Sequence, residues 1–260
     1  MRVFVISLER SRARRLVVES RLGELGIQFE FFAAIDAVAG EHLKFPRFPK
    51  KLRSRYGYRL TPGEAGCFAS HAMLWEACAT SGHPMLILED NVHLEPGFPR
   101  ALAAAAAELE HGTEFVRLNA SYRRRYVPLK QFDEDMQLVR YLKGPRGSTA
   151  YALSPEGARR LLDGVKHWAE PLDDYLDRFW VHGLPPLVIH PVTARRADVP
   201  TEIPGRKPPS GLSRVSHILV ANWDGLLRQA YNHRVGLSRS RAVMPERGID
   251  ESVATLGLSE

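Results

Sequence analysis

Two carboxylates follow directly after the most hydrophobic segment of the chain. Met85–Leu88 is a run of four apolar residues, and Glu89, Asp90 and Asn91 come next. Such a run predicts a strand buried on both faces, and ligands of open α/β sheets bind beyond the carboxyl ends of strands. Carboxylate oxygens there are suited to a divalent cation that bridges a diphosphate. The alternative is an exposed acidic turn that only ends the strand.

The predicted helix that precedes this strand in the sequence carries two further polar side chains, Glu64 and His71. In Thr61-Pro62-Gly63-Glu64, the threonine is a helix cap, the proline suits the first helical position and the glutamate completes a capping box. Apolar residues with helical spacing follow as far as Cys78, and Ser81-Gly82 ends the helix. His71 lies on the apolar face, so spacing alone indicates a core histidine. A role in a binding site remains the alternative for His71 and Glu64.

The other elements predict an α/β fold with a mostly parallel central sheet flanked by helices. Val3–Leu8 is predicted as a strand, Ser11–Leu25 as a helix and Ile27–Ala34 as a second strand. This strand–helix–strand start is typical of a doubly wound sheet. Further strands are expected at 115–119, 137–142, 148–153 and 187–190, and further helices at 97–110, 154–162 and 170–180.

Positive charge is concentrated in two stretches. The chain has 260 residues and a formal net charge of +6. Residues 44–59 hold seven Lys or Arg and no acid, and residues 206–241 hold seven against one acid, Asp224. Such clusters favour phosphate-rich partners, whereas the alternative is an ordinary solvated surface. We expect the first stretch to be a loop that closes over a bound ligand.

Composition also bears on location. No segment approaches the roughly 20 apolar residues that span a bilayer, and the N-terminal apolar run is too short for a signal peptide. We therefore expect a cytoplasmic protein. Cys67 and Cys78 are placed on one helix about 16 Å apart. A disulfide requires less than about 7 Å between Cα atoms, so both should be free thiols.

The chain divides at a segment rich in proline and glycine. Residues 199–211 are the predicted linker between a main domain, residues 1–198, and a basic C-terminal extension, residues 212–260. The extension contains an amphipathic helix. That helix either packs on the main domain or a second subunit, or lies on a membrane surface.

Several of these segments, taken in order, resemble glycosyltransferase family 25, the lipooligosaccharide galactosyltransferases related to collagen glycosyltransferases. They are residues 5–10 with Arg14-Arg15, then 31–36, 60–71, 87–92 and 147–158. Pro171-Leu172-Asp173 resembles the Pro-x-Asp element of the family. The resemblance covers roughly residues 3–203. Each segment is weak alone, whereas the ordered set is specific.

The resemblance implies a GT-A-like nucleotide-diphosphosugar transferase fold and an inverting hexosyltransferase. It would move a sugar, with galactose as the first candidate, from a UDP-sugar to a lipooligosaccharide or other glycan acceptor. The protein would lie peripherally at the inner membrane. The donor-binding residues that it implies are Ser7, Leu8, Arg10, Arg15, Asp36, Ser70, His71, Glu89 and Asp90. Asp36 ends the second predicted strand and is equally well explained as a turn residue.

An inverting transfer needs one carboxylate to deprotonate the acceptor hydroxyl. The resemblance assigns this role to Asp173, with Glu64 as the second catalytic candidate and Asp174 in reserve. Acids in a helix first turn are also favoured by the helix dipole alone.

The metal site is where the chain departs from the family. Asp90 and Asn91 stand where the family usually has two aspartates, so we expect weak Mn²⁺ or Mg²⁺ binding, or arginines that neutralise the diphosphate instead. The departure keeps open a catalytically degenerate protein that only binds nucleotide sugar or carbohydrate. A nucleic-acid binder has no recognised motif here, and the oligomeric state is left open.

Overall fold

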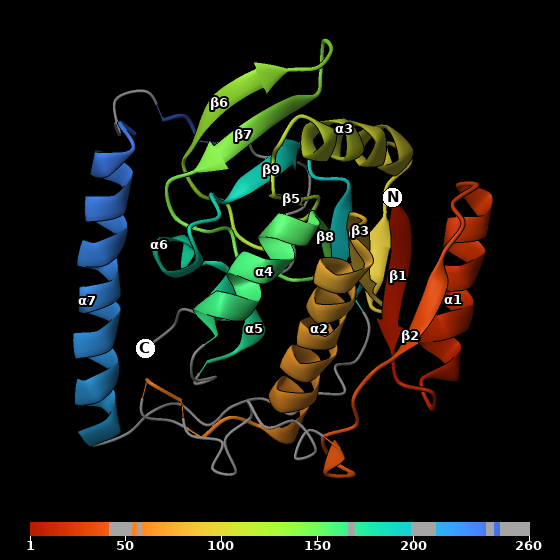
Figure 1. Ribbon diagram of the computed structural model, residues 1–260, viewed down its shortest axis with the longest axis horizontal. Coiled ribbons are helices and arrows are strands. Elements are labelled where there is room, and N and C mark those ends of the chain that lie inside the picture. The colour runs from red at the N-terminus through yellow and green to blue at the C-terminus, as the bar shows by residue number, and fades with distance from the viewer. Residues whose placement is uncertain (42–53, 57–58, 166–169, 199–211, 238–241, 245–260) are drawn as a thin grey trace.

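The fold is an α/β structure with one large central sheet (Figure 1). The computed structural model describes residues 1–41, 54–56, 59–165, 170–198, 212–237 and 242–244. Within them, eight strands pair in the order β2-β1-β3-β8-β5-β9-β7-β6. Their bounds are Arg2–Ser7 (β1), Glu30–Ala33 (β2), Met85–Glu89 (β3), Phe115–Arg117 (β5), Tyr126–Gln131 (β6), Gln137–Tyr141 (β7), Ala150–Leu153 (β8) and Leu187–His190 (β9). A small second sheet pairs β4 (Val92–Leu94) with β10 (Ala194–Arg196).

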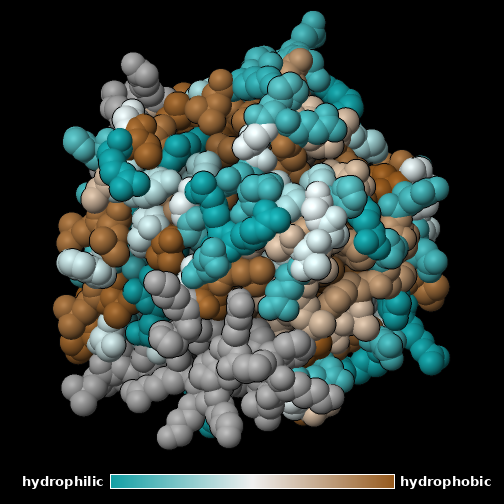
Figure 2. All heavy atoms as spheres, in the orientation of Figure 1, coloured by the Kyte–Doolittle hydropathy of each residue, from teal (hydrophilic) through white to brown (hydrophobic). Residues whose placement is uncertain are grey.

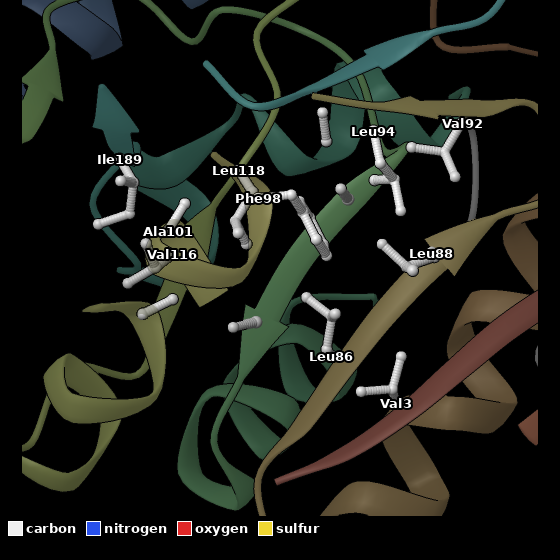
Figure 3. Packing of buried hydrophobic residues seen from close by; sticks show 14 of the residues in the cluster. Val3, Leu86, Leu88, Val92, Leu94, Phe98, Ala101, Val116, Leu118 and Ile189 are labelled. Atoms are coloured by element: carbon white, nitrogen blue, oxygen red, sulfur yellow. The ribbon is translucent and has the colours of Figure 1, made fainter. Parts of the chain in front are cut away.

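Helices cover both faces of the sheet. Their bounds are Arg12–Glu24 (α1), Pro62–Ser81 (α2), Phe98–Glu110 (α3), Pro155–Gly164 (α4), Leu172–Leu176 (α5), Phe179–His182 (α6) and Leu212–Arg234 (α7). Side chains alternate along β3, because successive residues of a strand point to opposite faces. Leu86 and Leu88 pack in one core with α1 and α3, and Figure 3 shows them in the same cluster as Phe98 and Ala101 of α3. Met85 and Ile87 pack in the other core with α2, α4 and α5.

The sheet is mixed, which corrects the prediction of a mostly parallel sheet. Strand β1 is parallel to β2 and β3, and β5 is parallel to β9. The other four pairings are antiparallel, because β8 runs back between β3 and β5, and β6 and β7 form a hairpin beside β9. All four residues of β8 are buried. A fully buried strand has the same apolar run in either direction, so its sequence did not reveal this reversal.

The prediction for the segment after Glu170 is also corrected. The sequence predicts one helix over residues 170–180, but the structure has two short helices, α5 and α6, with Asp177 and Arg178 between them. The Asp177 carboxylate accepts a hydrogen bond from the backbone N–H of Arg146 at 3.0 Å and forms an ion pair with Arg117 at 2.8 Å. These long-range contacts hold the break in the helix, and local sequence cannot indicate them.

Helix α2 forms as its sequence predicts. The Thr61 hydroxyl accepts a hydrogen bond from Glu64 N at 3.2 Å, and Glu64 Oε2 accepts one from Thr61 N at 2.9 Å, so the capping box is complete. The helix ends at Gly82, whose φ of 71° is the left-handed conformation that glycine adopts easily. Cys67 and Cys78 on this helix are free thiols, as expected.

Helix α7 packs against the main domain through a few polar contacts. It contacts α6, the Tyr231 hydroxyl donates to the Gly183 carbonyl at 3.2 Å, and the Asn232 amide donates to the Leu142 carbonyl at 2.8 Å. The linker at 199–211 and most of the basic loop at 44–59 lie outside the described residues, so the domain division and loop closure remain predictions. In the described part of the chain, no helix combines the length and apolar character needed to cross a membrane.

The close approach of α2 to the segment after β2 gives a stability prediction. A Cβ atom at Gly66 would collide with the backbone carbonyl of Ile35 and lie 3.3 Å from Ala37 Cβ. Gly66→Ala should therefore reduce the free energy of unfolding by about 1–3 kcal/mol, because backbone must move to relieve the overlap. Urea denaturation measures the change.

Gly23→Ala in α1 is the matched control. Nothing lies within 4 Å of a Cβ built there, so the helical preference of alanine should raise stability by about 0.5–1 kcal/mol. Equal destabilisation by both substitutions would contradict the tight approach at Gly66.

Candidate functional site

The end of β3 directs its two carboxylates to opposite sides of the sheet. Glu89 lies on the side of α2, where its Oε1 is 3.6 Å from His71 Nε2 and accepts a hydrogen bond from the Ser148 hydroxyl at 2.5 Å. Asp90 lies on the side of α1, where it accepts hydrogen bonds from the Ser7 hydroxyl at 2.7 Å and Arg14 Nη1 at 3.3 Å. Strand alternation therefore separates two residues that the sequence places together.

Glu89 is held in its ionised form. Burial raises the pKa of this carboxyl, but the His71 imidazole and the Ser148 hydroxyl lower it more strongly, so the net pKa lies below its ordinary value. The side chain of Glu89 is 19% exposed, and that of His71 is fully buried. A partly accessible carboxylate with fixed orientation is thus present at the carboxyl end of the strand, where ligands bind in such folds.

His71 is oriented by a chain of hydrogen bonds through the core. Trp75 Nε1 donates to the Tyr151 hydroxyl at 2.8 Å, and this hydroxyl lies 2.7 Å from His71 Nδ1. A phenol that accepts from tryptophan can donate its own proton to Nδ1, which assigns the imidazole proton to Nε2, on the side of Glu89. Within the described residues, Nε2 makes no hydrogen bond of normal length. The prediction of a core histidine is confirmed by the full burial of His71, and its role in donor binding stays a prediction.

The charges of three predicted carboxylates act on one thiol of α2. The pKa of Cys67 lies well above its ordinary value, because of burial first and then because of the negative charges of Glu89, Asp173 and Glu64. These three residues come from the end of β3, the start of α5 and the start of α2. The structure therefore brings together both predicted catalytic residues and one predicted donor residue.

A second group of charges lies beside this cluster. Arg146 Nη2 is 2.7 Å from Asp174 Oδ1, and the charges of Asp174, Asp173 and Asp177 all act on the Arg146 guanidinium. Arg146 is a non-glycine residue with a positive φ of 56°, which is uncommon and marks a constrained turn. This turn leads into Ser148, so the same local conformation positions the arginine and the serine that holds Glu89.

The adjoining glycine fits tightly. Gly147 has a φ of 93°, and a Cβ atom there would collide with the side chain of Asn119 and meet that of Ser121. Only glycine combines that backbone conformation with that lack of space. Glycine at this position therefore fixes the path of the chain into β8.

Other predicted donor residues lie around β1 and β2. Arg10 is exposed and paired with Asp36, and the Arg15 guanidinium lies 4.1 Å from the centre of the Phe31 ring. Leu8 is half-buried in the turn after β1. These residues are on the Asp90 side of the sheet edge or beyond β2, and their role in donor binding stays a prediction.

Ser70 has a structural function in this fold. Its hydroxyl donates to the Gly66 carbonyl at 2.7 Å and accepts from the backbone N–H of Ile35 at 2.8 Å, and the residue is fully buried. It thereby ties α2 to the segment that carries Asp36. Its predicted contact with the donor is not tested by this arrangement.

The predicted metal ligands fit a divalent cation poorly. Both oxygens of Asp90 already contact Ser7 or Arg14, and the arginine supplies the positive charge that a cation would bring. Asn91 Oδ1 is buried and makes no hydrogen bond among the described residues. Of the side-chain oxygens of Asp90 and Asn91, it is therefore the one without such a contact. Neutralisation by arginine, the alternative to a metal, stays a prediction.

Among the described residues, Cys67, His71 and Glu89 also form a group with metal-ligand chemistry. Their donor atoms lie within 4.8 Å of one another. Thiol, imidazole and carboxylate together suit a transition metal only when the thiol has lost its proton. Burial and the neighbouring carboxylates raise the pKa of the Cys67 thiol, so a metal here would have to displace its proton on binding.

Sequence reasoning missed several residues of the site. They are Arg14, Cys67, Arg117, Arg146, Ser148, Tyr151 and Asp177. The one local signal was the Arg146-Gly147-Ser148 turn before a predicted strand, because glycine there indicates a special backbone conformation. The others require knowledge of which elements pack together.

The convergence of carboxylates gives a prediction that Cys67 itself reports. In a Cys78→Ser background, Glu64→Gln, Glu89→Gln and Asp173→Asn should each lower the pKa of the Cys67 thiol. Each should raise its alkylation rate by up to about tenfold at fixed pH, because one pKa unit changes the thiolate fraction tenfold. The measurement is the rate of reaction with iodoacetamide across a pH series.

Glu76→Gln is the control, because Glu76 is exposed and lies nine positions further along the same helix. Its alkylation rate should match that of the background protein. Should the three test variants also match it, the carboxylates do not act on the thiol as described.

Comparisons with known proteins bear on the family of the chain. The family model described as glycosyltransferase family 25 (LPS biosynthesis protein) matches residues 1–176. A "Glycosyltransferase 25 family member" of Aedes aegypti is 28% identical over 190 residues, which are 67% of this chain and 30% of that protein. An "Inactive glycosyltransferase 25 family member 3" of Mus musculus is 31% identical over 194 residues, 67% of this chain and 31% of that protein.

The chain thus spans about a third of the length of the curated relatives that it matches. A crystal structure of a mannose-1-phosphate geranyltransferase from Thermus thermophilus covers 71% of this chain and 53% of its own, with 12% identity and a TM-score of 0.28. A similarity that low supports no conclusion about the fold. The match of the family model to two thirds of the chain shows that the chain belongs to glycosyltransferase family 25.

Proposed function

We propose that this chain is an inverting glycosyltransferase of GT-A-like fold. It moves a sugar, galactose being the first candidate, from a UDP-sugar to a lipooligosaccharide or other glycan acceptor on the cytoplasmic side of the membrane. The observation that carries the proposal is the convergence of Glu64, Glu89 and Asp173 around Cys67 at the carboxyl end of β3. Family membership and the place of this cluster at the sheet edge support it.

Asp173 is the proposed general base. It lies in the first turn of α5, and its charge acts both on Cys67 and on Arg146. Its neighbour Asp174 is engaged by Arg146 at 2.7 Å, which makes Asp174 the poorer proton acceptor. In the reaction, the acceptor hydroxyl would transfer its proton to Asp173 as its oxygen bonds to the anomeric carbon and the bond to the nucleoside diphosphate breaks.

The donor diphosphate is proposed to bind on the Asp90 side. Arg14 belongs to the first turn of α1 and lies 3.3 Å from Asp90, and Arg10 precedes the same helix. Backbone N–H groups at a helix N-terminus and guanidinium groups both bind phosphate oxygens. Asp90 then holds Arg14 in place, while Ser7 fixes the carboxylate. Arg14 and Arg10 would then share their charge between two aspartates, Asp90 and Asp36, and the leaving diphosphate.

The first prediction here concerns the base. Asp173→Asn keeps the size of the side chain and removes its basicity, so turnover should fall by about 10²–10⁴-fold. Donor binding should stay nearly unchanged, because the substitution removes an interaction of the transition state. Initial rates and isothermal titration with the nucleotide sugar measure the two effects.

Two variants make the result specific. Asp163→Asn changes an exposed acid on α4 and should retain full turnover. Asp174→Asn removes the ion pair with Arg146 and should have the smaller effect of the two neighbours. Full activity of Asp173→Asn would indicate that Glu64 is the base instead. Loss of activity only in Asp174→Asn would indicate that Asp174 is the base.

The second prediction concerns the cation. Because Arg14 already compensates Asp90, transfer should continue in EDTA or require unusually high Mn²⁺. Asn91→Asp adds a carboxylate and should tighten Mn²⁺ binding, since charge on the ligands governs affinity for hard cations. Tight Mn²⁺ binding by the unmodified chain, with activity lost on chelation, would contradict the arginine role.

A second candidate function is a nucleotide-sugar or carbohydrate-binding protein without catalysis. The neutral Asn91 in the family's acidic motif favours it, and one relative is named inactive, a description that applies to that mouse protein. The two functions differ in one measurement. A non-catalytic protein would bind UDP-sugar but release no UDP in the presence of any glycan acceptor.

A further inference from the structure

Helix α7 has two faces of opposite character. Asp224 is its innermost described side chain, with 6% exposure, and it therefore lies on the face turned toward the main domain. It is the only acid of the helix, and its carboxylate is 2.6 Å from Arg55 Nη1 and 3.1 Å from the Tyr56 hydroxyl. The inward face of the helix thus combines this buried acid with half-buried Val220, Leu227 and Tyr231, and the Tyr231 ring lies 5.3 Å from that of Phe179.

The outward face of α7 is apolar. Its exposed apolar side chains, which helical spacing places about 100° or more away from Asp224, are Val215, Ile218, Leu219, Trp223 and Leu226, with exposures of 54%, 49%, 64%, 59% and 59%. We call these five residues the α7 stripe. Figure 2 shows hydrophobic residues gathered along the edge of the molecule where Figure 1 places α7. A surface helix normally exposes a polar face, so this second, exposed apolar face is suited to contact with another surface.

Cations gather at the C-terminal half of the helix. An open pocket of about 760 Å³ lies between α7 and the chain around β6 and β7, and its charged lining is entirely basic. The cationic side chains of this lining are Arg124, Arg125, Lys143 and Arg228, with His233 beside them. The pKa of Lys143 lies below its ordinary value, first because of burial and then because of the charges of Arg124 and Arg228. We call this the basic pocket.

We propose that the α7 stripe and the basic pocket together form a docking surface for an anionic phospholipid membrane. The stripe would enter the boundary between headgroups and acyl chains, and the basic pocket would receive lipid phosphates. Apolar contact combined with flanking cations is what holds a helix in the plane of a membrane interface. The proposal concerns binding alone, so it can hold or fail independently of sugar transfer.

Charge favours a membrane over a second copy of the chain. In a two-fold symmetric dimer, each surface patch meets the same patch of its partner. Two copies joined through their stripes would leave both basic pockets without opposite charge, because among the described residues no acid of α7 lies outward to compensate them. An anionic bilayer supplies the opposite charge.

The test is co-sedimentation of the full chain with vesicles. Vesicles of phosphatidylcholine alone and vesicles in which about a third of the lipid is phosphatidylglycerol are compared at low and high salt. We expect binding to the anionic vesicles that weakens with salt, and at least about tenfold weaker binding to the neutral ones. Equal binding to both compositions, or none to either, would overturn the proposal.

Variants locate the contact. Leu219→Ser with Leu226→Ser should weaken binding by at least about tenfold, because two apolar side chains leave the interface. Lys143→Gln should weaken it about fivefold through loss of one charge. The matched control is Leu16→Ser with Val17→Ser on α1, where both side chains are 66% exposed, and it should bind like the unmodified chain.

A second measurement tests the competing occupant. Analytical ultracentrifugation without lipid should show a monomer in the unmodified chain and in both double variants. A dimer that the α7 double substitution converts to monomer would assign the stripe to a second copy and overturn the membrane proposal. Circular dichroism with the full helical signal in every variant ensures that lost binding reflects the surface.

Discussion

The site depends on keeping one nearly buried carboxylate ionised at the end of a central strand. Removing Glu89 from water disfavours its charge, and without compensation the group would take up a proton. The compensation comes from His71 on α2 and from Ser148 before β8, and His71 is in turn oriented by Tyr151 on β8. Three elements must therefore pack correctly before Glu89 has its charge and orientation. The Gly147 turn and the close approach of α2 both follow from this requirement.

Strand alternation then divides the site into two chemical environments. Glu89 belongs to a cluster of negative charge with Asp173 and Glu64, while Asp90 belongs to a neutralised group with Ser7 and Arg14. Arg14 lies beside Asp90, and arginine can balance the charge of a diphosphate. A second aspartate at position 91, which would hold a metal ion for that purpose, is therefore less necessary. The departure of this chain from the acidic motif of its family is consistent with the rest of that environment.

The sequence was sufficient for local features and insufficient for those that depend on packing. The limits of α2, its capping box and the free thiols were predicted correctly, because periodicity and capping are properties of neighbouring residues. The direction of β8 was not, because burial on both faces produces the same apolar run in a parallel and an antiparallel strand. The break at Asp177 depends on Arg117, which is 60 positions away. The gathering of residues 64, 89 and 173 around Cys67 likewise exists only in three dimensions, and the family resemblance supplied what the residue pattern could not.

One buried charge cluster links the outer helix to the proposed reaction centre. Glu170 contacts Arg178 at 2.5 Å and Arg55 at 3.9 Å, and Arg55 contacts Asp224 of α7 at 2.6 Å. Glu170 and Arg178 lie on either side of α5, the helix whose first turn holds Asp173. Such a cluster adds little net stability because its charges must be desolvated, yet removal of any one partner leaves another buried without compensation. It therefore acts chiefly as a geometric constraint. The position of α7, and with it the direction in which the stripe points, is fixed relative to the carboxylate proposed to take the proton.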